Sequence, residues 1–122
     1  MSRPLHVLMV EDHQDDVDLL LFTLHKGGFK VVHSVLNTPA AMRAALEARD
    51  WDVITSDHAL PHFSASAALS LAKELRSDIP FIIVSGEMDL NLAVSLMKEG
   101  AEDYIQKQEL PRVVPAIERA LR

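Results

Sequence analysis

Apolar, β-rich runs alternate five times with segments whose apolar residues recur at helical spacing, and this alternation constrains the fold most strongly. The predicted strands cover residues 5–10, 30–36, 51–56, 81–84 and 103–106. Strands that alternate with helices of this length form parallel βαβ units with right-handed crossovers, which place helices on both faces of one sheet. The expected fold class is therefore a doubly wound α/β domain with five parallel strands and five helices.

The strand order follows from how apolar each predicted strand is. Strands 5–10, 51–56 and 81–84 are almost continuously apolar, which is typical of central strands covered on both faces. The strand over residues 30–36 mixes Lys30 and His33 with valines, as suits an edge. We therefore expect the order 2-1-3-4-5.

Capping residues locate the beginnings of three helices. Thr38 can cap a helix with Pro39 at its first position, Ser64 or Ser66 can cap the next helix, and Asp89 the one after it. The expected inward-facing residues are Val17, Leu20, Leu21 and Leu24; Met42, Ala45 and Leu46; Ala68, Leu71, Ala72 and Leu75; Ala93, Leu96 and Met97; and Val113, Ile117, Ala120 and Leu121.

Glycines and a proline indicate where helices end or bend. Gly27-Gly28 should end the first helix, and Gly100 the fourth. The last predicted helix covers residues 110–121 and contains Pro115, which lacks a backbone donor. We expect the regular part of that helix to begin late or to bend at Pro115.

Length and charge limit the classes of function. The 122 residues correspond to about one domain, 1–122, and 48% hydrophobic with 25% charged residues is a globular balance. A net charge of −6 opposes direct binding to nucleic acid. The absence of cysteine excludes disulfides and thiolate sites. The apolar run 5–10 is short and leads directly into Glu11 and Asp12, so we expect no membrane insertion and a cytoplasmic protein.

Polar residues follow four of the five predicted strands. Glu11-Asp12 follow the first strand, Asp57 the third, Ser85-Gly86 the fourth and Lys107 the fifth. In such sheets, ligands bind beyond the carboxyl ends of the strands, where the strand order reverses. Three clustered carboxylates repel one another unless a hard cation lies between them, and oxygen ligands of this kind suit Mg²⁺.

This set of side chains is suited to phosphoryl transfer. A carboxylate such as Asp57 can act as a nucleophile toward phosphorus and form an acyl phosphate. The metal and Lys107 would neutralise the phosphoryl oxygens, and the Ser85 hydroxyl would donate a hydrogen bond to one of them.

Each residue also has a simpler interpretation. Acidic residues at a helix start often only complement the helix dipole, and we prefer this interpretation for Asp15 and Asp16. Ser85 alone could belong to an ordinary loop, Asp57 to a turn before Pro61, and Lys107 to the solvated surface. The combination of four strand ends favours a functional site.

The segments VLMVEDHQDD, WDVITSDHALP, FIIVSGE and GAEDYIQKQEL, in this order and spacing, resemble the receiver domains of two-component response regulators over essentially the whole chain. The resemblance implies a flavodoxin-like fold with Asp57 as phosphoacceptor. Asp12, Asp57 and the backbone carbonyl of Ala59 would contact Mg²⁺, and Glu11 would act mainly through metal-bound water. Ser85 matches the switch hydroxyl, Lys107 the lysine that pairs with the phosphoryl group, and Tyr104 the aromatic switch residue.

The resemblance also implies a phosphorylation switch and not an enzyme with an external product. The donor would be a histidine kinase or a histidine phosphotransfer protein. Phosphorylation would draw Ser85 toward the phosphoryl oxygens, let Tyr104 turn inward, and remodel a face made by helix four, strand five and helix five. Because the sequence stops at the fifth predicted helix, output should occur through protein contacts, or the chain is part of a larger regulator.

Some features depart from the family pattern. Gln108 follows Lys107 where the family often has a proline, so this loop need not contain a cis bond. His13, His58 and His62 fall near the predicted site, and we interpret them as exposed loop residues, with transition-metal binding as the less favoured alternative.

Two other functions remain open at this point. Phosphatases of the aspartyl-phosphate type also carry an aspartate at a strand end, but they need a second acid two residues later, where this chain has Ala59. A receiver-like interaction module that takes no phosphate is the second alternative, and the presence of every charged site residue disfavours it. The sequence does not identify the cognate kinase, the pathway or the oligomeric state.

Overall fold

The computed structural model describes residues 3–58, 60–87 and 89–122, and it shows a five-stranded parallel sheet with the order β2-β1-β3-β4-β5. The strands are β1 (Arg3–Val10), β2 (Phe29–Leu36), β3 (Val53–Ser56), β4 (Phe81–Ser85) and β5 (Asp103–Gln106). The helices are α1 (Gln14–Lys26), α2 (Pro39–Ala48), α3 (Ala65–Leu75), α4 (Leu90–Lys98) and α5 (Val113–Ala120). The predicted fold class and strand order are confirmed.

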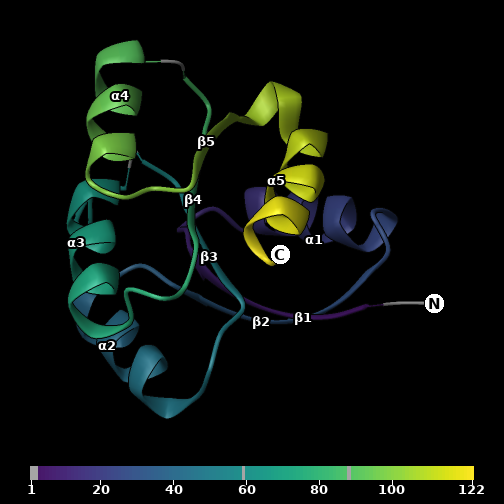
Figure 1. Cartoon of the computed structure of the whole chain (residues 1–122), viewed down its shortest axis with the longest axis horizontal. Helices are drawn as coiled ribbons and strands as arrows, with labels where there is room; N and C mark the ends of the chain where they lie inside the picture. Colours follow the sequence, from purple (N-terminus) through teal and green to yellow (C-terminus); the bar gives the residue numbers. More distant parts are fainter. Residues whose placement is uncertain (1–2, 59, 88) are drawn as a thin grey trace.

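The helices cover the sheet in two layers. Helices α1 and α5 lie against one face, and α2, α3 and α4 against the other (Figure 1). Two apolar cores result, one on each side of the central strands β1, β3 and β4, whose apolar side chains are almost all fully buried. Burial on both faces explains why these strands lack polar alternation.

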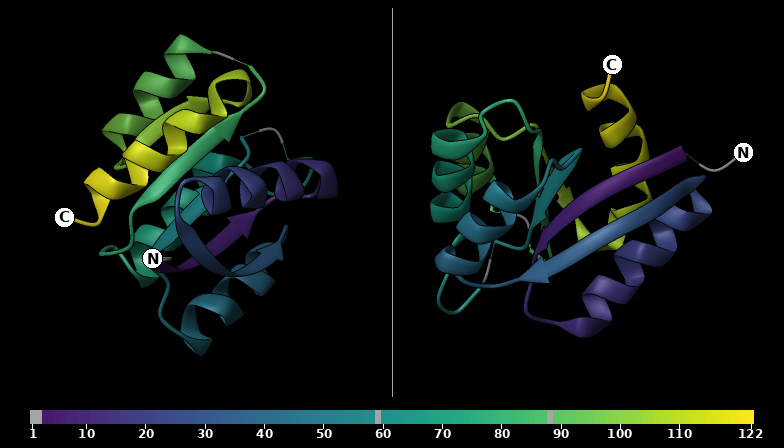
Figure 2. Two further views of the ribbon diagram at one scale, coloured as in Figure 1. Left: turned by 90° about the vertical axis from the view of Figure 1, so that its right-hand side faces the viewer. Right: turned by 90° about the horizontal axis from the view of Figure 1, so that it is seen from below.

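Strands β1 and β2 are longer than their neighbours. All eight residue pairs from Arg3–Phe29 to Val10–Leu36 are in register, whereas β3 pairs only with residues 7–10 of β1. The first half of β1 and β2 therefore extends beyond the other strands as a two-stranded ribbon (Figure 2). The edge position of β2 fits its exposed Val32 and Val35.

The predicted caps are confirmed, with Ser64 rather than Ser66 capping α3. The Thr38 hydroxyl accepts a hydrogen bond from the Ala41 amide at 3.2 Å, and Ser64 and Asp89 accept in the same way from Ala67 and Leu92. Gly100 follows α4 with a φ of 113°, a left-handed conformation that glycine adopts at low cost.

Thr38→Ala is expected to lower the free energy of unfolding by about 1 kcal/mol, because the Ala41 amide loses its capping acceptor. Urea denaturation measures this change. The matched control is Thr23→Ala within α1, where the Thr23 hydroxyl bonds only the Leu19 carbonyl and alanine favours the helix. Equal losses in the two variants would show that capping by Thr38 does not stabilise α2.

Three details of the predicted helices were wrong. Met97 is 42% exposed and Leu121 38% exposed, although both were expected to face inward. Leu69 is buried, although it was not assigned to the inward face of α3.

The last helix begins at Val113, after a 3-10 segment (Lys107–Arg112), and Pro115 lies in its first turn, where its missing donor costs nothing. The late start of α5 was predicted.

Candidate functional site

The site lies at the carboxyl ends of β1, β3 and β5, where the strand order reverses. The backbone fixes its acidic residues, because the ladder continues one residue past two strands. The Glu11 amide donates to the Leu36 carbonyl at 2.9 Å, and the Asp57 amide donates to the Val10 carbonyl at 3.0 Å. Both side chains therefore start from rigid backbone at one edge of the sheet.

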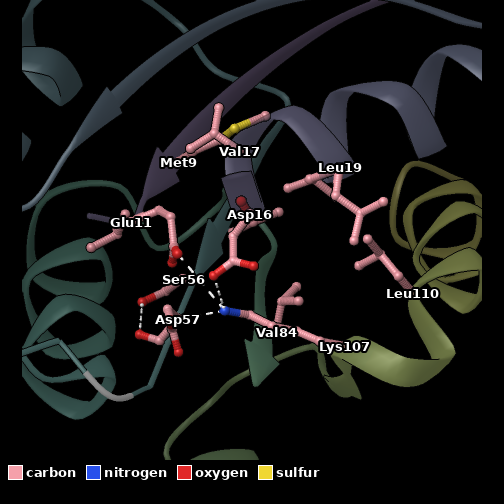
Figure 3. A pocket seen from close by; sticks show the side chains of 13 residues that line it. Met9, Glu11, Asp16, Val17, Leu19, Ser56, Asp57, Val84, Lys107 and Leu110 are labelled. Atoms are coloured by element: carbon pink, nitrogen blue, oxygen red, sulfur yellow. Dashed lines mark hydrogen bonds and ion pairs between the residues drawn. The ribbon is translucent and has the colours of Figure 1, made fainter. Parts of the chain in front are cut away.

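Lys107 connects three carboxylates at this edge. Its Nζ atom lies 2.6 Å from Oδ2 of Asp16, 3.1 Å from Oδ2 of Asp57 and 3.7 Å from Oε1 of Glu11. Figure 3 shows these three acidic side chains pointing toward the ammonium group, Asp16 from α1 and the other two from just after β1 and β3. The acidic side chains and Lys107 line one side of a pocket. Apolar side chains, including Val17, Leu19 and Leu110, line its other side.

The charged form of Glu11 is disfavoured by its surroundings. Its side chain is 9% exposed, and Oε1 has no hydrogen-bond partner among the described residues. Burial first, and then the negative charge of Asp57, raise the pKa of Glu11 to about 8 against the opposing effect of Lys107. These effects therefore favour the protonated form of Glu11 over its carboxylate when no cation is bound.

Lys107 and Asp16 keep their charges by pairing. Partial burial opposes the charge of Lys107, but hydrogen bonds to Asp16 and Asp57 and the negative charges of Glu11 and Asp57 outweigh it, so the pKa of Lys107 is raised. The hydrogen bond from Lys107 lowers the pKa of Asp16. Lys107 remains a cation across the physiological range.

The acidic group has the chemistry of a cation site. One ligand atom each from Glu11, His13, Asp16 and Asp57 lie within 4.8 Å of one another. Carboxylate oxygens suit a hard cation, and the buried Oε1 of Glu11, which no described residue hydrogen-bonds, is available as a ligand for one. The residues present therefore fit a divalent cation such as Mg²⁺.

The structure places Asp12 outside this group of ligand atoms. The Asp12 carboxylate lies 2.9 Å from Nδ1 of His13 and lines a neighbouring pocket on the β2 side with Leu36 and Asn37. Asp12 is thus beside the group of four ligand atoms and not within it. The predicted contact through the Ala59 carbonyl lies outside the described residues.

Sequence reasoning missed the position of Asp16. It lies in the first turn of α1, as predicted, but it also forms the shortest contact to Lys107. A signal was present in the sequence, because Asp16 precedes the buried Leu20 by four residues and so continues the inward face of α1 to the sheet edge.

Ser85 and Tyr104 form a hydrogen-bonded chain beside Asp57. Ser85 is fully buried, and its hydroxyl lies 2.6 Å from Nδ1 of His58 and accepts from the Glu87 amide at 3.1 Å. The Tyr104 hydroxyl donates to the Glu87 carbonyl at 3.2 Å. Tyr104 is 6% exposed, so its ring already occupies the inward position that was expected after phosphorylation.

The fold and this strand-end acidic site define a flavodoxin-like α/β domain with a polar site where the strand order reverses. A family model described as the response regulator receiver domain matches residues 7–118. The chain therefore belongs to the receiver domain family of two-component response regulators.

No helix among the described residues is long and apolar enough to cross a membrane.

Individual relatives agree with this assignment. The chain is 31% identical over 123 residues to the transcriptional regulatory protein FixJ of Bradyrhizobium diazoefficiens, covering 100% of this chain and 59% of FixJ. It is 28% identical to the response regulator SaeR of Staphylococcus aureus, covering 88% of this chain and 46% of SaeR. A receiver domain structure from Clostridium thermocellum superposes with a TM-score of 0.81 at 26% identity, covering 96% of this chain and 94% of that one. The chain thus spans about half the length of the two regulators.

Proposed function

We propose that this receiver domain accepts a phosphoryl group on Asp57 from a histidine kinase or a histidine phosphotransfer protein and thereby switches a protein-interaction face. The observation that carries the proposal is the contact of Asp57 with Lys107 at 3.1 Å, inside a group of acidic side chains at the strand ends. A pocket open to solvent lies beside Asp57 and Lys107 and is also lined by His13, Asp16 and His58. It gives a phosphoryl donor access to the Asp57 carboxylate.

The chain's own residues divide the chemistry. An Asp57 carboxylate oxygen attacks phosphorus, and the bond from phosphorus to the donor histidine nitrogen breaks, which leaves the imidazole with the donor. Lys107 stays close and neutralises charge on the phosphoryl oxygens, and the Ser85 hydroxyl donates a hydrogen bond to one of them. Bound Mg²⁺, held by Asp57 with Glu11 and Asp12 nearby, would supply further charge neutralisation.

The output face proposed for this domain is α4, β5 and α5. Three large apolar side chains on α4 are exposed, namely Leu90 at 70%, Val94 at 46% and Met97 at 42%. They recur at i, i+4 and i+7, so they form one outward apolar stripe, whereas Ala93 and Leu96 on the neighbouring side of the helix are buried. Such a stripe suits a protein target, whereas the net charge of −6 does not suit nucleic acid.

The domain would assist only its own phosphorylation and dephosphorylation, and it would turn over no external substrate. We place it in the cytoplasm, where its proposed phosphoryl donors act. The alternative function is an interaction module that takes no phosphate.

The test is incubation with acetyl phosphate or phosphoramidate, with and without Mg²⁺, followed by intact mass measurement. We expect one Mg²⁺-dependent addition of a single phosphoryl mass, because Asp57 is the only proposed acceptor and its acidic neighbours must be neutralised first. Failure to gain mass under any condition, including with a cognate kinase, would favour the phosphate-independent module.

A further inference from the structure

His58 follows the proposed phosphoacceptor directly and was expected to be an exposed loop residue. Its ring is instead half-buried, and Nδ1 lies 2.6 Å from the Ser85 hydroxyl oxygen. The ring centroids of His58 and Tyr104 are 6.4 Å apart. His58 therefore contacts both side chains that are predicted to switch.

The Ser85 hydroxyl has one proton to donate, and two acceptors compete for it in the proposed cycle. At rest, the oxygen accepts from the Glu87 amide at 3.1 Å and lies 2.6 Å from Nδ1 of His58. In the neutral tautomer with its ring proton on Nε2, Nδ1 accepts the hydroxyl proton of Ser85. In the phosphorylated state, the same proton must reach a phosphoryl oxygen. The contact with His58 has to break for that step.

The rest of the switch needs no such change in this structure. Tyr104 is already buried, with its hydroxyl on the Glu87 carbonyl, and Lys107 already contacts Asp57. Ser85 is the remaining residue whose partner must be exchanged. A buried hydroxyl that loses its acceptor is costly, so the partner of Ser85 strongly affects which state is favoured.

We propose that His58 is a positioning residue that holds the Ser85 hydroxyl in the resting state and thereby lowers the affinity of the domain for a phosphoryl group. This inference rests on the proposed phosphorylation of Asp57 and adds a chain-specific control to it. Removing the ring nitrogen leaves the Ser85 proton without its resting acceptor, which destabilises the resting state relative to the phosphorylated one.

The test compares His58→Phe with the wild type in titrations with beryllofluoride, a phosphoryl mimic, at constant Mg²⁺. Phenylalanine keeps a ring beside Tyr104 but removes the acceptor. We expect His58→Phe to bind the mimic about three to ten times more tightly, the size of one buried hydrogen bond. The NMR signal of the Gly86 amide, next to Ser85, reports the binding.

Two further variants separate a positioning role from a structural one. His58→Asn carries a polar atom near the position of Nδ1 and should bring the affinity back toward the wild-type value. His62→Phe alters an exposed histidine of the same loop and should leave the affinity unchanged. Thermal unfolding of each variant establishes that it is folded.

The outcomes distinguish this inference from the proposed function. Tighter binding in His58→Phe with recovery in His58→Asn supports the positioning role. Equal or weaker binding in folded His58→Phe, while the wild type binds the mimic, overturns the role of His58 alone. A wild type that neither binds the mimic nor gains phosphoryl mass overturns the phosphorylation of Asp57, and the role of His58 with it.

Discussion

Asp57→Asn is expected to reduce phosphoryl uptake from acetyl phosphate by at least about a hundredfold while the fold is retained. Asparagine has almost the same shape, but its amide oxygen carries no full negative charge and cannot form a stable acyl phosphate. The variant also removes one of three carboxyl groups that share Lys107, which relieves repulsion with the charged Asp16. The free energy of unfolding should therefore not fall, even though one contact to Lys107 is weakened.

Intact mass spectrometry and urea denaturation measure the two effects. Asp15→Asn is the matched control, because Asp15 is an exposed acid at the start of α1 that loses the same charge and should keep normal uptake. Persistent uptake in Asp57→Asn would place the acceptor elsewhere, with His13, His58 and the carboxylate of Asp16 as other nucleophiles that line the pocket. Hydroxylamine treatment would then discriminate, since it cleaves an acyl phosphate readily.

The architecture could be predicted from the sequence because its signals are local. The continuous apolar strands around Leu8, Ile54 and Ile83 could be satisfied only by burial on both faces, and those three side chains are fully buried. The parallel order then places all strand ends at one edge. The convergence of Glu11, Asp57 and Lys107 follows from that topology without knowledge of any side-chain contact.

The errors arise where a pattern fits two faces of one helix. Helix α4 has apolar residues on both sides, so period alone does not decide whether Met97 joins Leu96 inside or Val94 outside. The sheet surface available to α4 makes that choice, and it selects Ala93 and Leu96. Met97 therefore lies on the exposed stripe that we propose as part of the output face.

The placement of Asp16 and His58 depends on contacts between distant segments. Asp16 and Lys107 are 91 positions apart, and His58 and Ser85 are 27 apart. Strand ends predict that residues gather at an edge, but they do not determine which carboxylate reaches the ammonium group first. Asp12, adjacent to Glu11, shows this clearly, because its side chain lies on the β2 side of the group.

Glu11→Gln is expected to stabilise the cation-free protein at pH 8 by a few kcal/mol, on the order of 2 to 4, and to have a much smaller effect at pH 5. The pKa of Glu11 is about 8 in the folded protein against an ordinary value of 4.5, because burial and Asp57 disfavour the charged form. Between these two values the folded state binds a proton that the unfolded state has lost. The stability from this group is therefore fully present below about pH 4.5 and is lost as the pH rises to about 8.

Urea denaturation at several pH values between 5 and 8.5, in EDTA, tests the sign of this effect. Wild-type stability should fall across this range more than that of Glu11→Gln, whereas Glu47→Gln on the exposed face of α2 should behave as the wild type. Mg²⁺ competes with the proton at Glu11 in the proposed site, so added Mg²⁺ should restore the wild type more than Glu11→Gln at pH 8. A Glu11→Gln variant less stable than the wild type at pH 8 would mean that the carboxylate is charged and well paired. Glu11 would then stabilise the site through its ion pair with Lys107, and its Oε1 atom would not be an unpaired ligand for a cation.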